Sequence, residues 1–298
     1  MAGIFGWIKK VVKEIPPLYH LYLKMKRRKQ AVNFAQESRE IPGVFGRVHK
    51  YDFMIAGDTP EGVAGYNRIG ASVVSLIEQG LSIVNRKVSD VKSLLDFGCG
   101  YGRVTRALVQ TINPRKIHVF DVDPNAVFFC AQEFRVKPLY FKEPDIWDYS
   151  TVPFSRYDVI WLGSVFTHLS QAYTAEMLKM LVKLLKPGGL LIFTTHGDQT
   201  LHRLQTGYYG NRFKEDASEI IEKFNQIGFA FIPYEKEEVE ILPFNFVRAS
   251  DFGMTWMSQQ YVDNLVSQIS GGGVTLLRHL PLGWDHHQDV YYFQRKSP

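Results

Sequence analysis

Short runs of consecutive apolar residues alternate with apolar residues at helical spacing along most of the chain. The consecutive runs predict strands, and they cover residues 93–97, 116–122, 138–141, 157–162, 190–195, 274–277 and 289–294. Between them, apolar positions three and four residues apart predict helices, of which 170–185 and 258–267 are the best defined. Strands that alternate with helices are typical of an α/β fold.

Three glycines at every second position follow the first predicted strand. Asp96 ends the apolar run, Gly98, Gly100 and Gly102 come next, and Arg103 opens a predicted helix. Without Cβ atoms, the glycines can take positive φ and let a ligand lie against the backbone, beside the unpaired N–H groups at the start of the helix. The pattern therefore favours a strand that turns sharply beneath a cofactor. A glycine-rich turn without a ligand is the alternative.

The spacing of these glycines separates two classes of ligand. A dinucleotide fingerprint, Gly-x-Gly-x-x-Gly, needs a third glycine at position 103, where this chain has arginine. The carboxylate of Asp96 is poorly placed beside a pyrophosphate but well placed for a cationic α-ammonium group. The stretch resembles motif I of the class I S-adenosylmethionine (SAM) methyltransferases. This resemblance implies SAM as the cofactor, with Asp96, the three glycines and Arg103 as cofactor-binding residues.

An acid also follows the second predicted strand. Asp123 precedes Pro124 at the start of a predicted helix, and Asp121 lies two residues earlier on the same strand face. In the family that the glycine motif resembles, an acid at this point accepts hydrogen bonds from both ribose hydroxyls, and we assign that role to Asp123. Asp121 is the runner-up, and either side chain could instead cap the helix without contacting a ligand.

Two further parts of the cofactor site depend on the resemblance. After the third strand, it puts an acid on the adenine amino group and an apolar neighbour against the ring, and Asp145 and Ile146 fit those roles. A solvated loop acid is the alternative for Asp145, and Asp148 competes with it. The fourth strand leads into Gly163 and Ser164, which we include among the cofactor-binding residues.

The order of these motifs matches the class I methyltransferases over about residues 90–196. The resemblance implies a Rossmann-like α/β fold with a seven-stranded, mostly parallel sheet, an antiparallel last strand and helices on both faces. Softer signatures are similar to a bacterial branch associated with glycan biosynthesis: they are Ser164–Ser170, Thr194–Gly197, the run Phe252-Gly-Met-Thr-Trp and the run that begins at Gly283. This branch implies O-methylation of a sugar, a glycan or a related small polar acceptor. N- or O-methylation of another small metabolite, and a non-catalytic SAM-binding membrane-associated partner protein, are the alternatives.

Two histidines are candidate catalytic bases. A sugar hydroxyl has to lose its proton during methyl transfer, and its high pKa makes a nearby general base useful. His168 follows the fourth strand and is the first candidate, and His196 follows the fifth strand and is the second. Both strands end at the edge where open α/β sheets bind ligands. As an alternative, His168 could start a helix and bond only to the backbone.

The net charge of +5 raises the question of a nucleic-acid partner, but much of the positive charge lies near the N-terminus. Residues 1–30 carry apolar positions at helical spacing against lysines and end in a basic run, which predicts a basic amphipathic arm. Peripheral contact with an anionic membrane and packing against the fold or a second subunit are both open for this arm. No run is long enough to span a bilayer, and no nucleic-acid partner is expected because the catalytic half contains no recognition module.

The domain organisation follows from these patterns. We expect the basic arm over residues 1–40, cap or lid helices over 41–90, and the SAM-binding domain over 91–298, with an insertion at about 197–256 that shapes the acceptor pocket. In the cap, a helix is predicted from Ile69 to Gln79. Tyr66 and Arg68 are candidate lid contacts, with ordinary packing as the alternative.

The number of cysteines bears on the redox state of the compartment in which the protein works. The chain contains two cysteines, Cys99 and Cys130, which supply neither a disulfide framework nor a metal cluster. A reducing cytoplasm is the simple interpretation, at the inner face of the membrane if the arm binds lipid.

A polar loop near the C-terminal end suggests a metal at first sight. It contains Asp285, His286, His287 and Asp289, but adjacent histidines point in different directions and spacing fixes no further ligand. We therefore expect loop residues near the acceptor pocket and no metal. The expected partner is a small-molecule or glycan acceptor, and the oligomeric state stays open.

Overall fold

The computed structural model describes residues 37–140, 153–206, 208–209, 213, 216–235 and 249–297. The chain forms two compact units, Met1–Phe53 and Met54–Pro298. In the first unit, strands β1 (Ser38–Arg39) and β2 (Val48–His49) pair antiparallel. Residues 1–36, which make up most of the predicted arm, lie outside the described residues.

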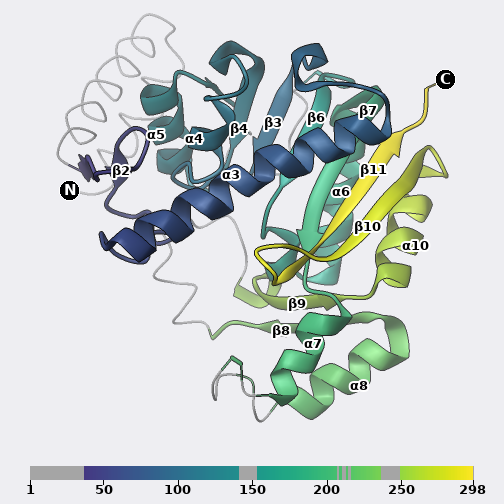
Figure 1. The fold of residues 1–298 in the computed structure, drawn as a ribbon. Coiled ribbons are helices and arrows are strands. Elements are labelled where there is room, and N and C mark those ends of the chain that lie inside the picture. Colours follow the sequence, from purple (N-terminus) through teal and green to yellow (C-terminus); the bar gives the residue numbers. More distant parts are fainter. Residues whose placement is uncertain are drawn as a thin grey trace, which may run out of the picture. The chain divides into compact units, whose positions relative to one another are not determined.

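The second unit is built on a seven-stranded sheet with the order β10-β11-β7-β6-β3-β4-β5 (Figure 1). Five strands pair parallel, and β11 runs antiparallel to both of its neighbours. This confirms the predicted Rossmann-like fold class. The strands are β3 (Leu94–Phe97), β4 (Ile117–Phe120), β5 (Lys137–Pro138), β6 (Tyr157–Leu162), β7 (Leu185–Thr195), β10 (Val274–Trp284) and β11 (Gln288–Arg295).

Burial explains why the central strands are continuous apolar runs. Every residue of β3, β4 and β6 is buried, because helices cover both faces of the sheet. The edge strand β5 is shorter than the predicted run over residues 138–141. Both of its residues are exposed, and Pro138 has no N–H to donate to a further strand, which suits an edge position.

The long helix α3 (Pro60–Ile83) covers one face of the sheet, and Gly80 lies against Ile192 and Tyr292. Its start is set by Thr59, whose hydroxyl accepts a hydrogen bond from Gly62 N. The prediction of a helix from Ile69 to Gln79 was therefore too short at both ends.

Two shorter helices lie beside α3. In α4 (Thr105–Leu108), the guanidinium of Arg106 lies 5.2 Å from the ring centre of Tyr66 in α3 and 5.1 Å from that of Phe134 in α5 (Pro124–Phe134). The 3₁₀ turns of the unit are η1 (Val88–Asp90), η2 (Pro114–Lys116), η3 (Phe166–His168) and η4 (Ala249–Asp251).

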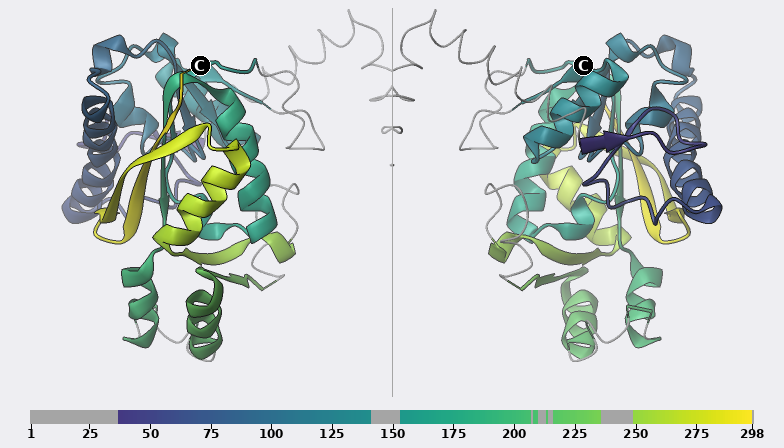
Figure 2. Two further views of the ribbon diagram at one scale, coloured as in Figure 1. Left: turned by 90° about the vertical axis from the view of Figure 1, so that its right-hand side faces the viewer. Right: turned by 90° about the vertical axis from the view of Figure 1, so that its left-hand side faces the viewer.

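Helices α6 (Gln171–Leu184) and α10 (Gln259–Ser270) cover the opposite face (Figure 2). Leu181 and Val266 belong to the same buried cluster as Phe193 and Tyr291 of the sheet. Among the helices of the described residues, none combines the length and the apolar character needed to cross a bilayer.

Between β7 and α10 the chain forms a separate layer at the carboxyl end of the parallel strands (Figure 1). It consists of α7 (Asp198–Gln205), α8 (Ala217–Ile227) and the antiparallel pair β8 (Phe229–Pro233) and β9 (Gly253–Met257). This layer, here called the insertion, has its own apolar cluster, which includes Leu201, Leu204, Ile220, Phe224 and Trp256.

Candidate active site

The turn after β3 is shaped by its three glycines, all of which have positive φ. A Cβ atom at Gly98 would lie 2.4 Å from Val165, and one at Gly102 would lie 2.5 Å from the ring of Phe134. A Cβ atom at Gly100, where φ is +48°, would have no described neighbour within 4 Å. Gly98 and Gly102 thus allow close packing, whereas Gly100 presents bare backbone to open space, as a cofactor cradle requires.

The two charged residues that flank these glycines contact the protein itself. Asp96 is 1% exposed and accepts a hydrogen bond from the Thr105 hydroxyl at 2.6 Å. Burial raises the pKa of Asp96 to about 7. The guanidinium of Arg103 lies 5.4 Å from the ring centre of Trp284, the last residue of β10. Asp96 therefore connects the end of β3 to the start of α4 through Thr105, and Arg103 packs the turn against β10 through Trp284.

The two acids after β4 have different surroundings. Asp123 is 4% exposed, its Oδ1 accepts from Asn125 N at 2.9 Å, and its Oδ2 accepts from the Tyr101 hydroxyl at 2.8 Å. The capping role that the sequence left open for either acid is thus filled by Asp123. Asp121 lies directly against the glycine turn, where its Oδ2 accepts from Gly100 N at 2.8 Å.

Burial raises the pKa of Asp121 to about 6. The other carboxylate oxygen of Asp121 accepts from Asp123 N at 2.9 Å. Asp121 is the more exposed of the two acids and lies beside the bare backbone of Gly100. It is therefore the better placed of the two to contact a ligand in the cradle.

A ring of hydrogen bonds joins the ends of β6, β7 and β11. Ser164, which has φ of +59°, donates its N–H to the Thr194 hydroxyl at 2.8 Å. That hydroxyl donates to Gln288 Oε1 at 2.5 Å, and Gln288 Nε2 donates to the Ser164 hydroxyl at 2.9 Å. Gly163 lies beside this ring, against Trp161 and Trp284. Sequence reasoning missed Gln288, although it included the run that contains it among the softer signatures.

The two candidate bases follow neighbouring strands, His168 after β6 and His196 after β7, and both contact the insertion. His168 is partly buried, and its Nδ1 lies 3.1 Å from Gly253 O and 2.8 Å from the Tyr234 hydroxyl. His196 is 3% exposed, and its Nδ1 lies 3.1 Å from Thr255 O. Burial, together with the neighbouring His168 and His287, lowers the pKa of His196 well below its ordinary value, so this imidazole is neutral near pH 7.

The polar side chains predicted to share one loop lie in the turn between β10 and β11 and at the start of β11, and each has a separate partner. Asp285 pairs with Arg68 at 2.8 Å, His287 Nδ1 accepts from Arg203 at 2.7 Å, and Asp289 contacts His279 at 2.8 Å. Across the part of the chain that the structure describes, no group of three or more histidine, cysteine or acidic side chains could hold a metal ion.

Four other predicted contact residues remain to be placed. Asp145 and Ile146 lie outside the described residues. Tyr66 is 2% exposed and its hydroxyl accepts from Arg106 Nε at 3.0 Å. The salt bridge of Arg68 with Asp285 connects α3 to the loop between β10 and β11.

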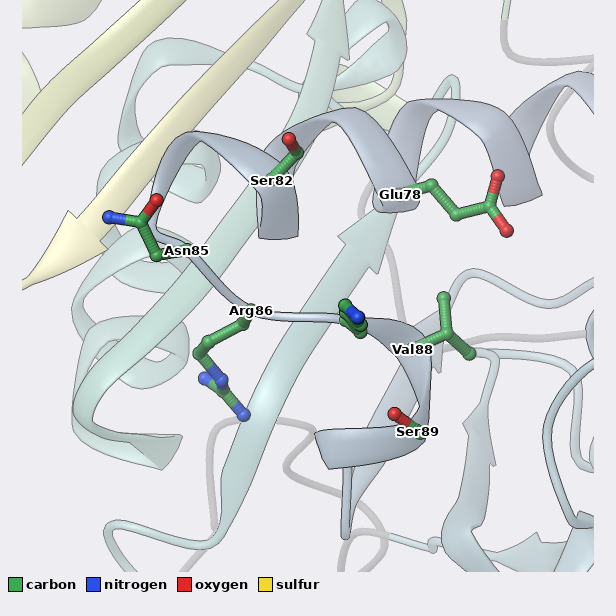
Figure 3. Close-up of a pocket in the computed structure, with 7 residues that line it drawn as sticks. Glu78, Ser82, Asn85, Arg86, Val88 and Ser89 are labelled. Carbon is green, nitrogen blue, oxygen red and sulfur yellow. The ribbon is translucent and has the colours of Figure 1, made fainter.

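A polar hollow lies at the opposite end of the sheet, between the last turn of α3 and η1, which precedes β3 (Figure 3). Arg86 in this hollow lies 3.5 Å from Asp158 at the start of β6. The hollow is therefore remote from the glycine turn, and we assign it no role in the site. Its lining residues are Glu78, Ser82, Asn85, Arg86, Lys87, Val88 and Ser89.

Comparison with known proteins agrees with this geometry. Residues 95–191 match the family model described as a methyltransferase domain. The sheet order, the glycine turn and this match together make the region a class I SAM-dependent methyltransferase domain, for which SAM is the cofactor.

Among the relatives is the malonyl-[acyl-carrier protein] O-methyltransferase of Porphyromonas gingivalis, 27% identical over 157 residues that cover 52% of this chain and 57% of the relative. The rat N-terminal Xaa-Pro-Lys N-methyltransferase 1 is 32% identical over 102 residues, which cover 33% of this chain and 44% of the relative. The chain spans about half the length of the curated relatives it matches.

A solved structure with a similar arrangement is the magnesium protoporphyrin IX methyltransferase of Synechocystis PCC 6803 with bound SAH. It has 13% sequence identity and a TM-score of 0.48, and the match covers 80% of this chain and 90% of that one.

Proposed function

We propose that this protein transfers the methyl group of SAM to a hydroxyl oxygen of a small polar acceptor, and we favour a sugar or glycan as that acceptor. The observation that carries the proposal is the position of the open Gly100 backbone and the partly buried His168 at the ends of the paired strands β3 and β6. Cofactor and acceptor sites at one sheet edge are what an in-line displacement requires.

On the cofactor side, the bare backbone at Gly100 gives room for the ligand and Asp121 provides carboxylate oxygens beside it. We propose that Asp121, rather than the Asp123 favoured from the sequence, accepts the ribose hydroxyls. Each acid already accepts two hydrogen bonds, so the choice rests on exposure: Asp121 is partly exposed beside Gly100, whereas Asp123 is buried. SAM, when bound, supplies a methyl group on a positively charged sulfur.

On the acceptor side, His168 takes the proton of the acceptor hydroxyl as a general base. The insertion carries aromatic and polar groups to this edge, because Tyr234 contacts His168, and Tyr208 stacks on His287 with ring centres 5.5 Å apart. Rings and hydrogen-bonding groups together suit a hydroxylated acceptor.

O-methylation of a carboxyl group is the second candidate, and it is favoured by the relatives named as malonyl-[acyl-carrier protein] O-methyltransferases. A carboxylate needs no base, because it is already deprotonated at neutral pH. The two candidates therefore differ in their dependence on His168.

Calorimetric titration with SAM is the first test, with NAD as the control ligand. Saturable binding of SAM and none of NAD is expected. Asp121→Asn should weaken SAM binding by about tenfold or more, since about 1.4 kcal/mol corresponds to tenfold. Asp123→Ser preserves a capping oxygen and should bind SAM nearly as tightly as the wild type. If Asp123→Ser lost more SAM affinity than Asp121→Asn, the ribose hydroxyls would be assigned to Asp123.

Transfer of the methyl group is then assayed with isotope-labelled SAM against nucleotide sugars, glycans and malonyl thioesters. Labelled sugar, lost in His168→Gln while SAM affinity is retained, is the expected result. Labelled malonyl thioester that persists in His168→Gln would favour the carboxyl alternative. SAM binding without transfer to any acceptor would favour a non-catalytic SAM-binding protein.

A further inference from the structure

One edge of strand β9 is turned toward both candidate bases. The other edge pairs with β8, where Met254 lies opposite Ile232 and Trp256 lies opposite Ala230. Backbone groups of alternate residues in a strand point to the same side. Accordingly, the carbonyls of Gly253 and Thr255, two residues apart, lie 3.1 Å from His168 Nδ1 and 3.1 Å from His196 Nδ1.

These contacts favour one position of the proton on each ring. A carbonyl oxygen only accepts hydrogen bonds, so the nitrogen that faces it must donate. A neutral imidazole has a single N–H, and placing it on Nδ1 leaves the lone pair on Nε2. The carbonyl contacts favour the same Nδ1–H tautomer for His168 and His196, which leaves Nε2 as the nitrogen able to take a proton. In this tautomer the Tyr234 hydroxyl, 2.8 Å from His168 Nδ1, accepts a hydrogen bond and does not donate one.

Strand β9 is itself bonded to the segments that follow β6 and β7. The Thr255 hydroxyl donates to Leu169 O at 2.6 Å, and Met257 N donates to His196 O at 2.8 Å. Tyr234, just beyond β8, bonds through its N–H to Phe252 O at 2.9 Å and places its hydroxyl 2.8 Å from His168 Nδ1. The insertion thus contacts Nδ1 of His168 through two groups, the Gly253 carbonyl and the Tyr234 hydroxyl.

We propose that β9 and Tyr234 are positioning elements for the general base: they hold His168 as the Nδ1–H tautomer, so that its Nε2 receives the proton of the acceptor. Tyr234 acts through His168 and is a positioning residue. His196 shares the tautomer but is 3% exposed, so it supports the site and does not meet the acceptor. This inference rests on the proposed function, since it assigns the geometry of its base.

The test is nuclear magnetic resonance of the full chain labelled with ¹⁵N at histidine, recorded at pH 8, where an ordinary imidazole is neutral. The signals of the two rings are assigned from their loss in His168→Gln and His196→Gln. Both rings should show a protonated Nδ1 and an unprotonated Nε2. A protonated Nε2 at His168 would overturn the proposal.

Tyr234→Phe tests the second contact. Its His168 signals should shift and show a share of the Nε2–H tautomer, while those of His196 stay unchanged. Tyr292→Phe is the matched control, because Tyr292 lies on the other face of the sheet against Gly80, and it should alter neither ring. Unchanged His168 signals in Tyr234→Phe would contradict the positioning role.

Calorimetry with SAM on the same samples distinguishes a failure of the proposed function from a failure of the positioning inference. Absence of SAM binding in the wild type would refute the proposed function whatever the tautomers. Normal SAM binding with the wrong tautomer at His168 would refute only the positioning inference.

Discussion

At the scale of single residues, the absence of a Cβ atom has different effects at two glycines of the turn after β3. At Gly102 it makes room for the ring of Phe134, and at Gly100 it leaves the backbone bare toward open space. The first absence serves the packing of α5, and the second is available to a ligand. Substitution by alanine at each position should therefore affect different properties of the protein.

For Gly100→Ala, we expect a loss of about 1–2 kcal/mol in the free energy of unfolding, from the left-handed backbone alone. Its affinity for SAM should fall by about tenfold or more, because the new methyl group points toward the cofactor. Gly102→Ala should lose about 3 kcal/mol of stability through overpacking and strain. Urea denaturation and calorimetry measure the two effects. Unchanged SAM affinity in Gly100→Ala would show that SAM does not lie against the backbone of Gly100.

Asp96 gives a prediction for pH. Its pKa in the fold is about 7, raised from an ordinary value of 3.8, so folding favours the protonated form. The stabilisation is complete below about pH 4 and is lost as the pH rises through 7. Asp96→Asn cannot titrate, and its stability relative to the wild type should rise by about 3 kcal/mol between pH 4 and pH 8. Urea denaturation at both pH values checks this, and a constant difference would contradict the raised pKa.

At the scale of elements, the sequence predicts features set by neighbouring residues but not contacts between residues far apart in the chain. The central strands follow from their apolar runs, and the glycine turn from its spacing. The cap at Asp123 was ambiguous, because Asp121 and Asp123 share a strand face and only the fold shows which one accepts from Asn125. The contacts of His168 with Gly253 and Tyr234 could not be inferred, since they join residues 85 and 66 positions apart in the chain.

The amino ends of three strands are joined by one carboxylate. Asp158 in β6 accepts from Lys92 N at 3.0 Å and Ser93 N at 2.9 Å, just before β3, and from Lys186 Nζ at 3.0 Å in β7. Burial alone would raise the pKa of Asp158, but these hydrogen bonds hold its pKa below the ordinary value. The charged form is therefore the one that stabilises the sheet.

Asp158→Asn should cost about 1–3 kcal/mol in the free energy of unfolding at pH 7, since the buried donors lose a charged acceptor. Because the folded pKa is lowered, the deficit should shrink as the pH falls below about 4. Glu176→Gln is the control: its pair with Lys179 is exposed, and its loss should change stability by less than about 0.5 kcal/mol. Equal losses in the two variants would contradict the joining role.

At the scale of the whole molecule, a ligand that binds only the folded protein should raise its melting temperature. SAM at one hundred times its dissociation constant stabilises the folded state by about 2.7 kcal/mol, which corresponds to about 5–10 °C for a domain of this size. Differential scanning fluorimetry measures the shift. NAD should give none, and Asp121→Asn should lose most of the SAM effect. An equal shift with NAD would contradict the cofactor assignment.

The place of β11 has a consequence for synthesis. It is the last of the seven strands along the chain, yet it lies inside the sheet, between β7 and β10. A growing polypeptide therefore leaves the ribosome with β7 as an open edge, and β10 has no partner strand until residues 288–295 have been translated. Because an open edge can pair with other chains, the nascent protein is most vulnerable to aggregation in the interval just before its final strand emerges.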